Sequence, residues 1–117
     1  MDLTKLKEIK FSLMKRETDV KDGKAEYTKK KTAKFQFPEN FFKNTSEEEV
    51  MKDLISNMIN DLKTDAPSEA DTLGLWVQYD SITLDNAMSL SALDGILEYS
   101  KEPINPYYEF FMMTITN

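Results

Sequence analysis

The sequence contains neither cysteine nor histidine and has only three glycines. The absence of cysteine excludes disulfides, thiolate zinc sites and thiol catalysis. The absence of histidine excludes Ser-His-Asp and Cys-His triads and imidazole metal ligands. The three glycines, at positions 23, 74 and 95, cannot supply a phosphate-binding loop or a dinucleotide-binding pattern. We therefore expect a protein that is not an enzyme and that uses no cofactor and no metal.

Long apolar runs are also missing. A membrane-spanning helix needs about 20 predominantly apolar residues, and no stretch of this chain approaches that length. The first ten residues, MDLTKLKEIK, lack the apolar core of a secretion signal, so we expect no membrane partner and a cytoplasmic location. The 117 residues are 40% hydrophobic, which fits one domain over residues 1–117 with a buried core.

Charge is distributed unevenly along the chain. Residues 1–36 contain eleven basic and six acidic residues, whereas residues 37–117 contain four basic and fifteen acidic residues. Such asymmetry is typical of proteins that bind a polyanion or a basic partner, but two parts of one fold can also attract each other in this way. The distribution therefore identifies two candidate surfaces, one basic and one acidic.

Alternating residues predict a β-hairpin over Ile9–Phe37. Apolar and polar residues alternate over 9–14 and again over 27–37, and Asp22-Gly23 between them is a typical hairpin turn. A two-residue turn would mix apolar and polar residues on one face, so we expect a three-residue loop with a bulge or a left-handed residue near Gly23. That register pairs Ile9 with Phe37 and Phe11 with Phe35, and it places Lys15 opposite Lys31 and Arg16 opposite Lys30.

The clearest helix signal lies at Ser46–Lys63. Thr45 with Glu48 and Ser46 with Glu49 have the spacing of a capping box. The apolar residues between positions 50 and 62 recur at helical spacing and form one stripe. A helix with this stripe is long enough to cover one face of a sheet.

The remainder of the chain predicts further strands. Leu73–Leu84 alternates between apolar and polar residues, with a new strand beginning near Ile82. Residues 89–101 fit a short helix, although Gly95 weakens that pattern. The apolar and aromatic segment Tyr107–Thr116 predicts a buried terminal strand.

These elements predict an α+β fold. We expect a curved, mainly antiparallel sheet or a pseudo-barrel, packed against one main amphipathic helix and a second short one. The expected core contains Leu54, Ile55 and Met58 of the helix together with Phe35, Val77, Phe110 and Met112.

The basic hairpin is the first candidate binding surface. Cations on strands can contact phosphates while an exposed aromatic ring stacks on an unpaired base. Tyr27, near the hairpin tip, is the expected stacking residue, because Phe11 and Phe35 are needed for the core. The predicted site for single-stranded RNA or DNA comprises Lys10, Lys15, Arg16, Tyr27, Lys29, Lys30, Lys31 and Lys34.

Two alternatives to this site stay open. The lysines can simply be solvated at the hairpin tip, as most charged residues are. The acidic surface of residues 37–117 can instead bind a protein partner, by mimicking nucleic-acid phosphates or by filling a basic groove. In that case acids such as Glu47, Asp53 and Asp61 contact the partner.

The size of the chain, its Lys-, Asn- and Phe-rich composition, and its order of hairpin (Ile9–Phe37), helix (Ser46–Lys63) and strands resemble small accessory proteins of Gram-positive conjugative plasmids, the PrgU-like regulators among them. The resemblance implies a PUA-like pseudo-barrel and RNA-directed control of a plasmid operon. It assigns no role to any single residue of this chain.

Overall fold

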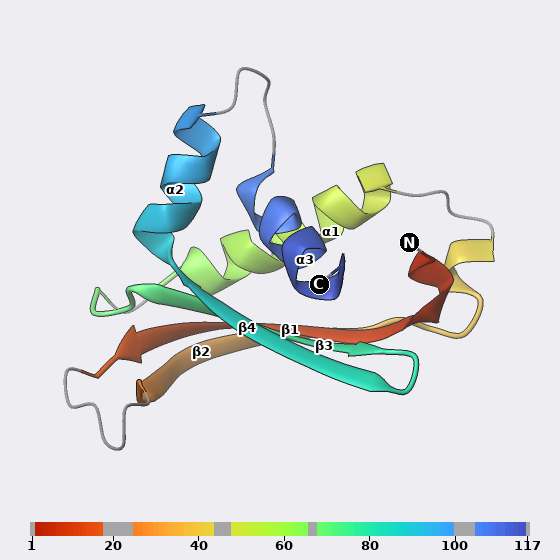
Figure 1. Ribbon diagram of the computed structural model, residues 1–117, viewed down its shortest axis with the longest axis horizontal. Helices are drawn as coiled ribbons and strands as arrows, with labels where there is room; N and C mark the ends of the chain where they lie inside the picture. Colours follow the sequence, from red (N-terminus) through yellow and green to blue (C-terminus); the bar gives the residue numbers. More distant parts are fainter. Residues whose placement is uncertain (1, 18–24, 44–47, 66–67, 100–104, 117) are drawn as a thin grey trace.

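The computed structural model describes residues 2–17, 25–43, 48–65, 68–99 and 105–116. Within them lie four strands, β1 (Leu6–Arg16), β2 (Tyr27–Gln36), β3 (Thr72–Tyr79) and β4 (Ile82–Ser89), and three α-helices, α1 (Glu48–Lys63), α2 (Leu90–Tyr99) and α3 (Pro106–Thr116) (Figure 1). The short 3₁₀ helices η1 (Leu3–Lys5) and η2 (Phe41–Lys43) precede β1 and follow β2. The strands form one antiparallel sheet in the order β2-β1-β3-β4. The predicted α+β class is confirmed.

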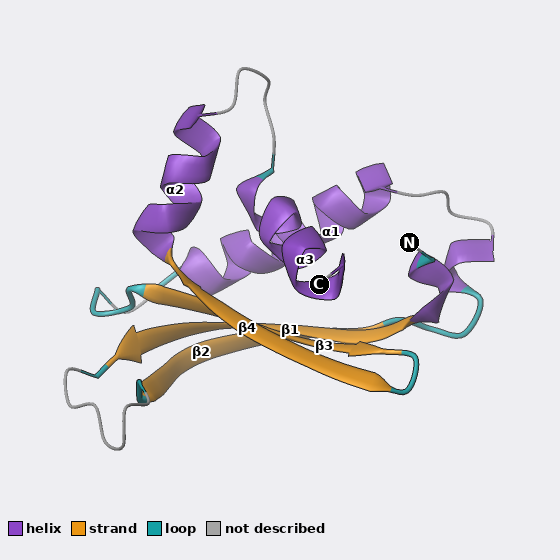
Figure 2. Cartoon of the chain, viewed as in Figure 1, coloured by secondary structure: helices purple, strands orange, loops and turns teal. Residues whose placement is uncertain are grey.

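All three α-helices lie on the same face of the sheet (Figure 2). The core lies between these helices and the sheet. Its fully buried side chains include Ile9, Phe11, Leu13, Ile55, Ile59, Leu73, Leu75, Phe110 and Phe111. In the described part of the chain, no helix covers the opposite face of the sheet. The sheet is open, with β2 and β4 at its edges, so these four strands do not close into a pseudo-barrel.

The register of β1 and β2 differs from the prediction. Ile9 pairs with Phe35 rather than Phe37, and Phe11 pairs with Ala33. A slip of two residues leaves every side chain on its original face, because the strand period is two. The alternation of apolar residues therefore could not distinguish the two registers. The predicted loop around Gly23 lies outside the described residues.

A β-bulge interrupts this pairing. Leu13 pairs with Lys31, whereas the next residue, Met14, pairs with Lys29, so Lys30 is the extra residue on β2. On the Tyr27 side of the bulge, each side chain of β2 points to the face opposite the one that uninterrupted alternation from Phe35 would give it. The pairs of like charges that the predicted register implied do not form, because Lys15 lies opposite Thr28.

The C-terminal segment is a helix, and the predicted terminal strand was wrong. The Asn105 side-chain oxygen accepts hydrogen bonds from the backbone N–H groups of Tyr107 and Tyr108, at 3.0 and 3.1 Å. Asn is a favoured N-cap and Pro106 is a favoured first helical residue. With these signals at its start, the segment buries Phe110, Phe111 and Thr114 on one helical face.

The predicted helix α1 is present and ends at Lys63 as expected, while Thr45 and Ser46 lie outside the described residues. The short helix expected within 89–101 is α2. Ile55, Met58, Val77 and Phe110 are buried as predicted, whereas Leu54, Phe35 and Met112 pack half-buried against the core. None of the described helices is long and apolar enough to cross a membrane.

Candidate nucleic-acid interface

The uncovered face of the sheet carries most of the predicted binding residues. Side chains alternate between the two faces of each strand, so the residues that flank the core positions point away from the helices. We call this surface the open face; it comprises Glu8, Lys10, Ser12, Met14 and Arg16 of β1, Tyr27, Lys29, Thr32, Lys34 and Gln36 of β2, Thr72, Gly74, Trp76 and Gln78 of β3, and Thr83, Asp85, Ala87 and Ser89 of β4.

An aromatic ring lies at the centre of the open face. Trp76, the single tryptophan of the chain, is half-buried on β3 and pairs with Lys10 of β1. The Lys10 Nζ lies 4.1 Å from the ring centroid, which is a cation–π contact. Sequence reasoning missed Trp76 as a site residue. Its position among the polar residues of an alternating strand, between Gly74 and Gln78, was the signal that could have identified it.

A shallow hollow of about 420 Å³ lies beside Trp76. Its lining includes Ser12, Met14, Lys29 and Gly74. A Cβ atom at Gly74 would lie 2.5 Å from Met14 Cε, so the missing side chain at this position lets Met14 lie across β3. The hollow therefore joins the tryptophan of β3 to the lysine of β2, and its lining also contains the carboxylate of Asp85 on β4.

One carboxylate reduces the positive charge around Lys10 and Lys34 on the open face. Lys10 and Lys34 are directly opposite each other, an arrangement that destabilises a strand pair unless it is compensated. Glu8 lies between them, with its Oε1 3.8 Å from Lys10 Nζ and 3.6 Å from Lys34 Nζ. Both lysine side chains keep a third or more of their surface exposed, so they can still contact a ligand.

Arg16 and Tyr27 occupy the other end of the open face. They pair across β1 and β2, and Tyr27 is 40% exposed. The backbone N–H of Arg16 donates to the Asp71 carboxylate at 3.0 Å, and the Thr72 hydroxyl donates to the same oxygen at 2.8 Å. These two hydrogen bonds hold the pKa of Asp71 below its usual value, with the bond from Arg16 contributing most. Asp71 thereby fixes the backbone that carries Arg16.

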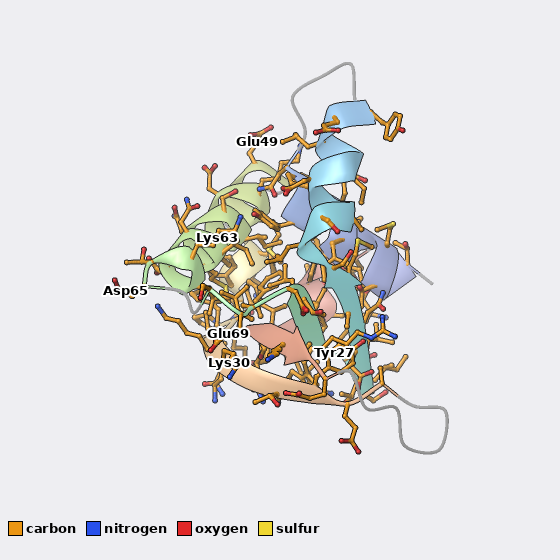
Figure 3. The ribbon with its side chains drawn as sticks, turned by 90° about the vertical axis from the view of Figure 1, so that its left-hand side faces the viewer. Tyr27, Lys30, Glu49, Lys63, Asp65 and Glu69 are labelled. Carbon is orange, nitrogen blue, oxygen red and sulfur yellow. The ribbon has the colours of Figure 1, made fainter. Side chains whose placement is uncertain are left out.

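Three predicted site residues lie elsewhere. Lys31 points to the helix side, where its Nζ donates to the backbone oxygens of Asp61 and Thr64 at 2.9 and 2.6 Å, at the C-terminal end of α1. Lys30, at the bulge, lies 3.9 Å from Glu69, and Figure 3 shows these two side chains together beside β2. Lys15 has the same orientation as the core residues of β1. The lysine run 29–31 is thus divided among three environments.

The acidic residues of α1 lie on the helix side of the molecule. Glu48, Glu49, Asp53 and Asp61 are exposed on this helix, and Glu47 lies outside the described residues. The acidic residues of α1 therefore lie on the side of the sheet opposite the open face, whereas Glu69 pairs with Lys30 and Asp85 lies on the open face itself.

No group of three or more acidic side chains that could hold a metal ion occurs within the described ranges. The comparisons with known proteins add no further assignment, because no protein-family model, curated protein or solved structure matches this chain significantly.

Proposed function

We propose that this protein is a non-enzymatic regulator that binds single-stranded RNA through the open face of its sheet. The observation that carries the proposal is the position of Trp76 beside Lys10, at the centre of a sheet face that no described helix covers. A ring in that position can stack on an unpaired base, and every base offers a face for stacking.

The cations around the ring support the same function. Lys10, Arg16, Lys29 and Lys34 lie on β1 and β2, on one side of Trp76, and can contact the phosphates of a strand whose base stacks on the ring. They outnumber the carboxylates of Glu8 and Asp85 on this face, which makes a local positive surface on an acidic protein. The placement favours single strands over duplexes, because bases in a duplex are stacked on one another and cannot reach Trp76.

The biological process that we propose is control of a mobile-element operon. The resemblance to plasmid accessory proteins supports this process, and an RNA-binding surface without catalytic groups is compatible with it. The acidic residues of α1 offer the alternative, a protein-binding inhibitor, and the experiment below distinguishes the two.

The proposal is tested by fluorescence anisotropy with a labelled single-stranded RNA of about 12 nucleotides, a matched DNA strand and a duplex. With about four phosphates neutralised at a slope of ~0.7 each, raising the salt from about 50 to about 200 mM should weaken binding ~50-fold. Trp76→Ala should weaken binding by about 1–3 kcal/mol. Asp53→Asn and Asp61→Asn serve as controls and should leave binding unchanged.

Absence of binding to every oligonucleotide at low salt would refute the proposal. An unchanged affinity of the folded Trp76→Ala variant would refute the role of the open face. If Asp53→Asn and Asp61→Asn instead abolish capture of a basic protein partner while the tryptophan variant is silent, the acidic alternative is correct.

A further inference from the structure

A second and larger hollow lies where β1 begins and β2 ends. Its volume is about 630 Å³, and its lining includes Leu6, Lys7, Phe37, Phe41, Phe42 and Lys43. We call it the phenylalanine pocket. The 3₁₀ helices η1 and η2 contact each other at this end of the sheet, and Thr4 of η1 and Phe41, Phe42 and Lys43 of η2 belong to the lining.

Aromatic rings form the wall of the phenylalanine pocket. Phe37 and Phe42 are stacked with their centroids 5.5 Å apart and their planes at 27°. Phe41 meets both rings edge-on, at 5.4 and 5.0 Å. All three rings are half-buried, so part of each surface faces the hollow. Such a wall suits a flat aromatic ligand, which can stack on one ring and contact the edge of another.

The backbone holds these rings in place. The Phe37 N–H donates to the Lys7 carbonyl at 2.8 Å, which ties the segment after β2 to the start of β1. Asn40 has a φ of 67°, and the Phe41 N–H donates to the Pro38 carbonyl at 3.0 Å. This turn brings Phe41 and Phe42 back against Phe37. The pocket is thus built into the connection between two elements rather than formed by a single mobile side chain.

The charges at the rim favour an anionic ligand. Lys7 and Lys43 are exposed lining residues, and within the described chain neither forms an ion pair. Glu39 is the acidic residue of the lining, so cations outnumber anions at the rim. An aromatic wall flanked by two unpaired ammonium groups is complementary to a flat ring that carries a negative group.

We propose that the phenylalanine pocket binds a nucleoside phosphate, with the base against the phenylalanine rings and the phosphate between Lys7 and Lys43. The ligand can be a free mononucleotide or the phosphorylated end of a nucleic-acid strand, since both present the same group. The proposal does not rest on the open face. Trp76 and Phe35, the ring that contacts Phe37 at 4.9 Å, lie on opposite faces of the sheet.

Isothermal titration calorimetry with AMP, adenosine and inorganic phosphate tests this site. AMP should bind at least about tenfold more tightly than adenosine, because adenosine has no phosphate to make charge-assisted contacts with the two lysines. It should also bind more tightly than inorganic phosphate, which cannot stack. The double variant Lys7→Gln/Lys43→Gln should reduce AMP affinity by about tenfold or more, while Lys5→Gln, an exposed neighbour outside the lining, should not.

Two further measurements separate the possible ligands and the two sites. The first is the affinity of a tetranucleotide with a 5′ phosphate. If it binds more tightly than both AMP and its own dephosphorylated form, the ligand is the end of a strand. If it binds no more tightly than AMP, the ligand is a mononucleotide. AMP bound in the phenylalanine pocket should not change the fluorescence of Trp76, whereas RNA on the open face should. Either site can therefore fail without the other.

Three results would overturn the proposal. They are the absence of AMP binding, binding that survives the double lysine variant, and an equal loss of binding in Lys5→Gln. Phe42→Leu, which keeps an apolar side chain but removes one ring, should weaken the binding of AMP without preventing folding. Its thermal unfolding, measured beside the wild type, shows that a loss of AMP binding is not a loss of structure.

Discussion

Lys29 and Lys31 of β2 point to opposite faces of the sheet although only one residue separates them. Lys29 lines the hollow beside Trp76, and Lys31 donates to the backbone oxygens at the end of α1. In a regular strand residues two apart share a face, and the bulge at Lys30 reverses that rule here. Two lysines of the same strand therefore have separable roles.

The two lysines make a matched pair of variants. Lys29→Gln should lower the salt slope of RNA binding by about 0.7, the contribution of one neutralised phosphate, and leave the free energy of unfolding unchanged. Lys31→Gln should leave the salt slope of RNA binding unchanged. It should lower the free energy of unfolding by about 1 kcal/mol, because it removes charged donors from the C-terminus of α1. Anisotropy and urea unfolding measure the two effects. Equal loss of RNA binding in both variants would contradict the division of the strand.

The buried stripe of α1 gives a second prediction. Ile55 is fully buried, whereas Leu54 packs half-buried beside it. Ile55→Ala should cost about 2–5 kcal/mol, and Leu54→Ala should cost less because part of that side chain is already in water. Urea unfolding of the two variants decides the order. A larger loss for Leu54→Ala would show that the helix is rotated about its axis.

Local patterns in the sequence were sufficient for the elements whose two faces differ. The stripe of α1 and the alternation of β3 each have one apolar and one polar face, so the period could be read directly. The segment 106–116 is apolar on nearly every side, and its composition resembled a buried strand. The decisive residue was Asn105, whose cap satisfies the first backbone N–H groups of α3.

The candidate site was predicted in part for a related reason. The cationic strands were visible in the sequence, but the bulge at Lys30 was not, and it decides which lysines of β2 reach the open face. Trp76 belongs to a strand distant in sequence from the hairpin, and only the pairing of β1 with β3 places it beside Lys10. Sites assembled across strands depend on register, which a period of two leaves undetermined.

Asn105 itself supports a third prediction. Its amide nitrogen also donates to the Lys52 carbonyl at 3.1 Å and to the Ser56 hydroxyl, so one side chain caps α3 and ties it to α1. Asn105→Ala should cost about 1–2 kcal/mol through loss of the cap. Asn105→Ser restores a capping oxygen but not the tie to α1, so it should recover part of that loss. Thermal unfolding compares the variants, and identical stabilities for Ala and Ser would disprove the capping role.

The last prediction concerns the dependence of stability on pH through the carboxyl group of Asp71. The hydrogen bonds from Arg16 and Thr72 lower the pKa of Asp71 from its usual value of 3.8. A carboxylate whose pKa is depressed by folding stabilises the folded state above its unfolded pKa. That contribution is lost as the pH falls from about 4 through the lower pKa of the folded state. Asp71 should therefore make the protein less stable at pH 3 than at pH 7.

Asp71→Asn tests this directly, because asparagine keeps an acceptor oxygen for the Arg16 N–H but does not titrate. The variant should be less stable than the wild type at pH 7, and the difference should shrink as the pH falls toward 3. Asp53→Asn, at an exposed position on α1, is the control and should leave the pH dependence of unfolding unaltered. The expected result is a convergence of the Asp71→Asn and wild-type unfolding curves in acid. Parallel curves from pH 7 to pH 3 would mean that the ionisation of Asp71 is not linked to folding.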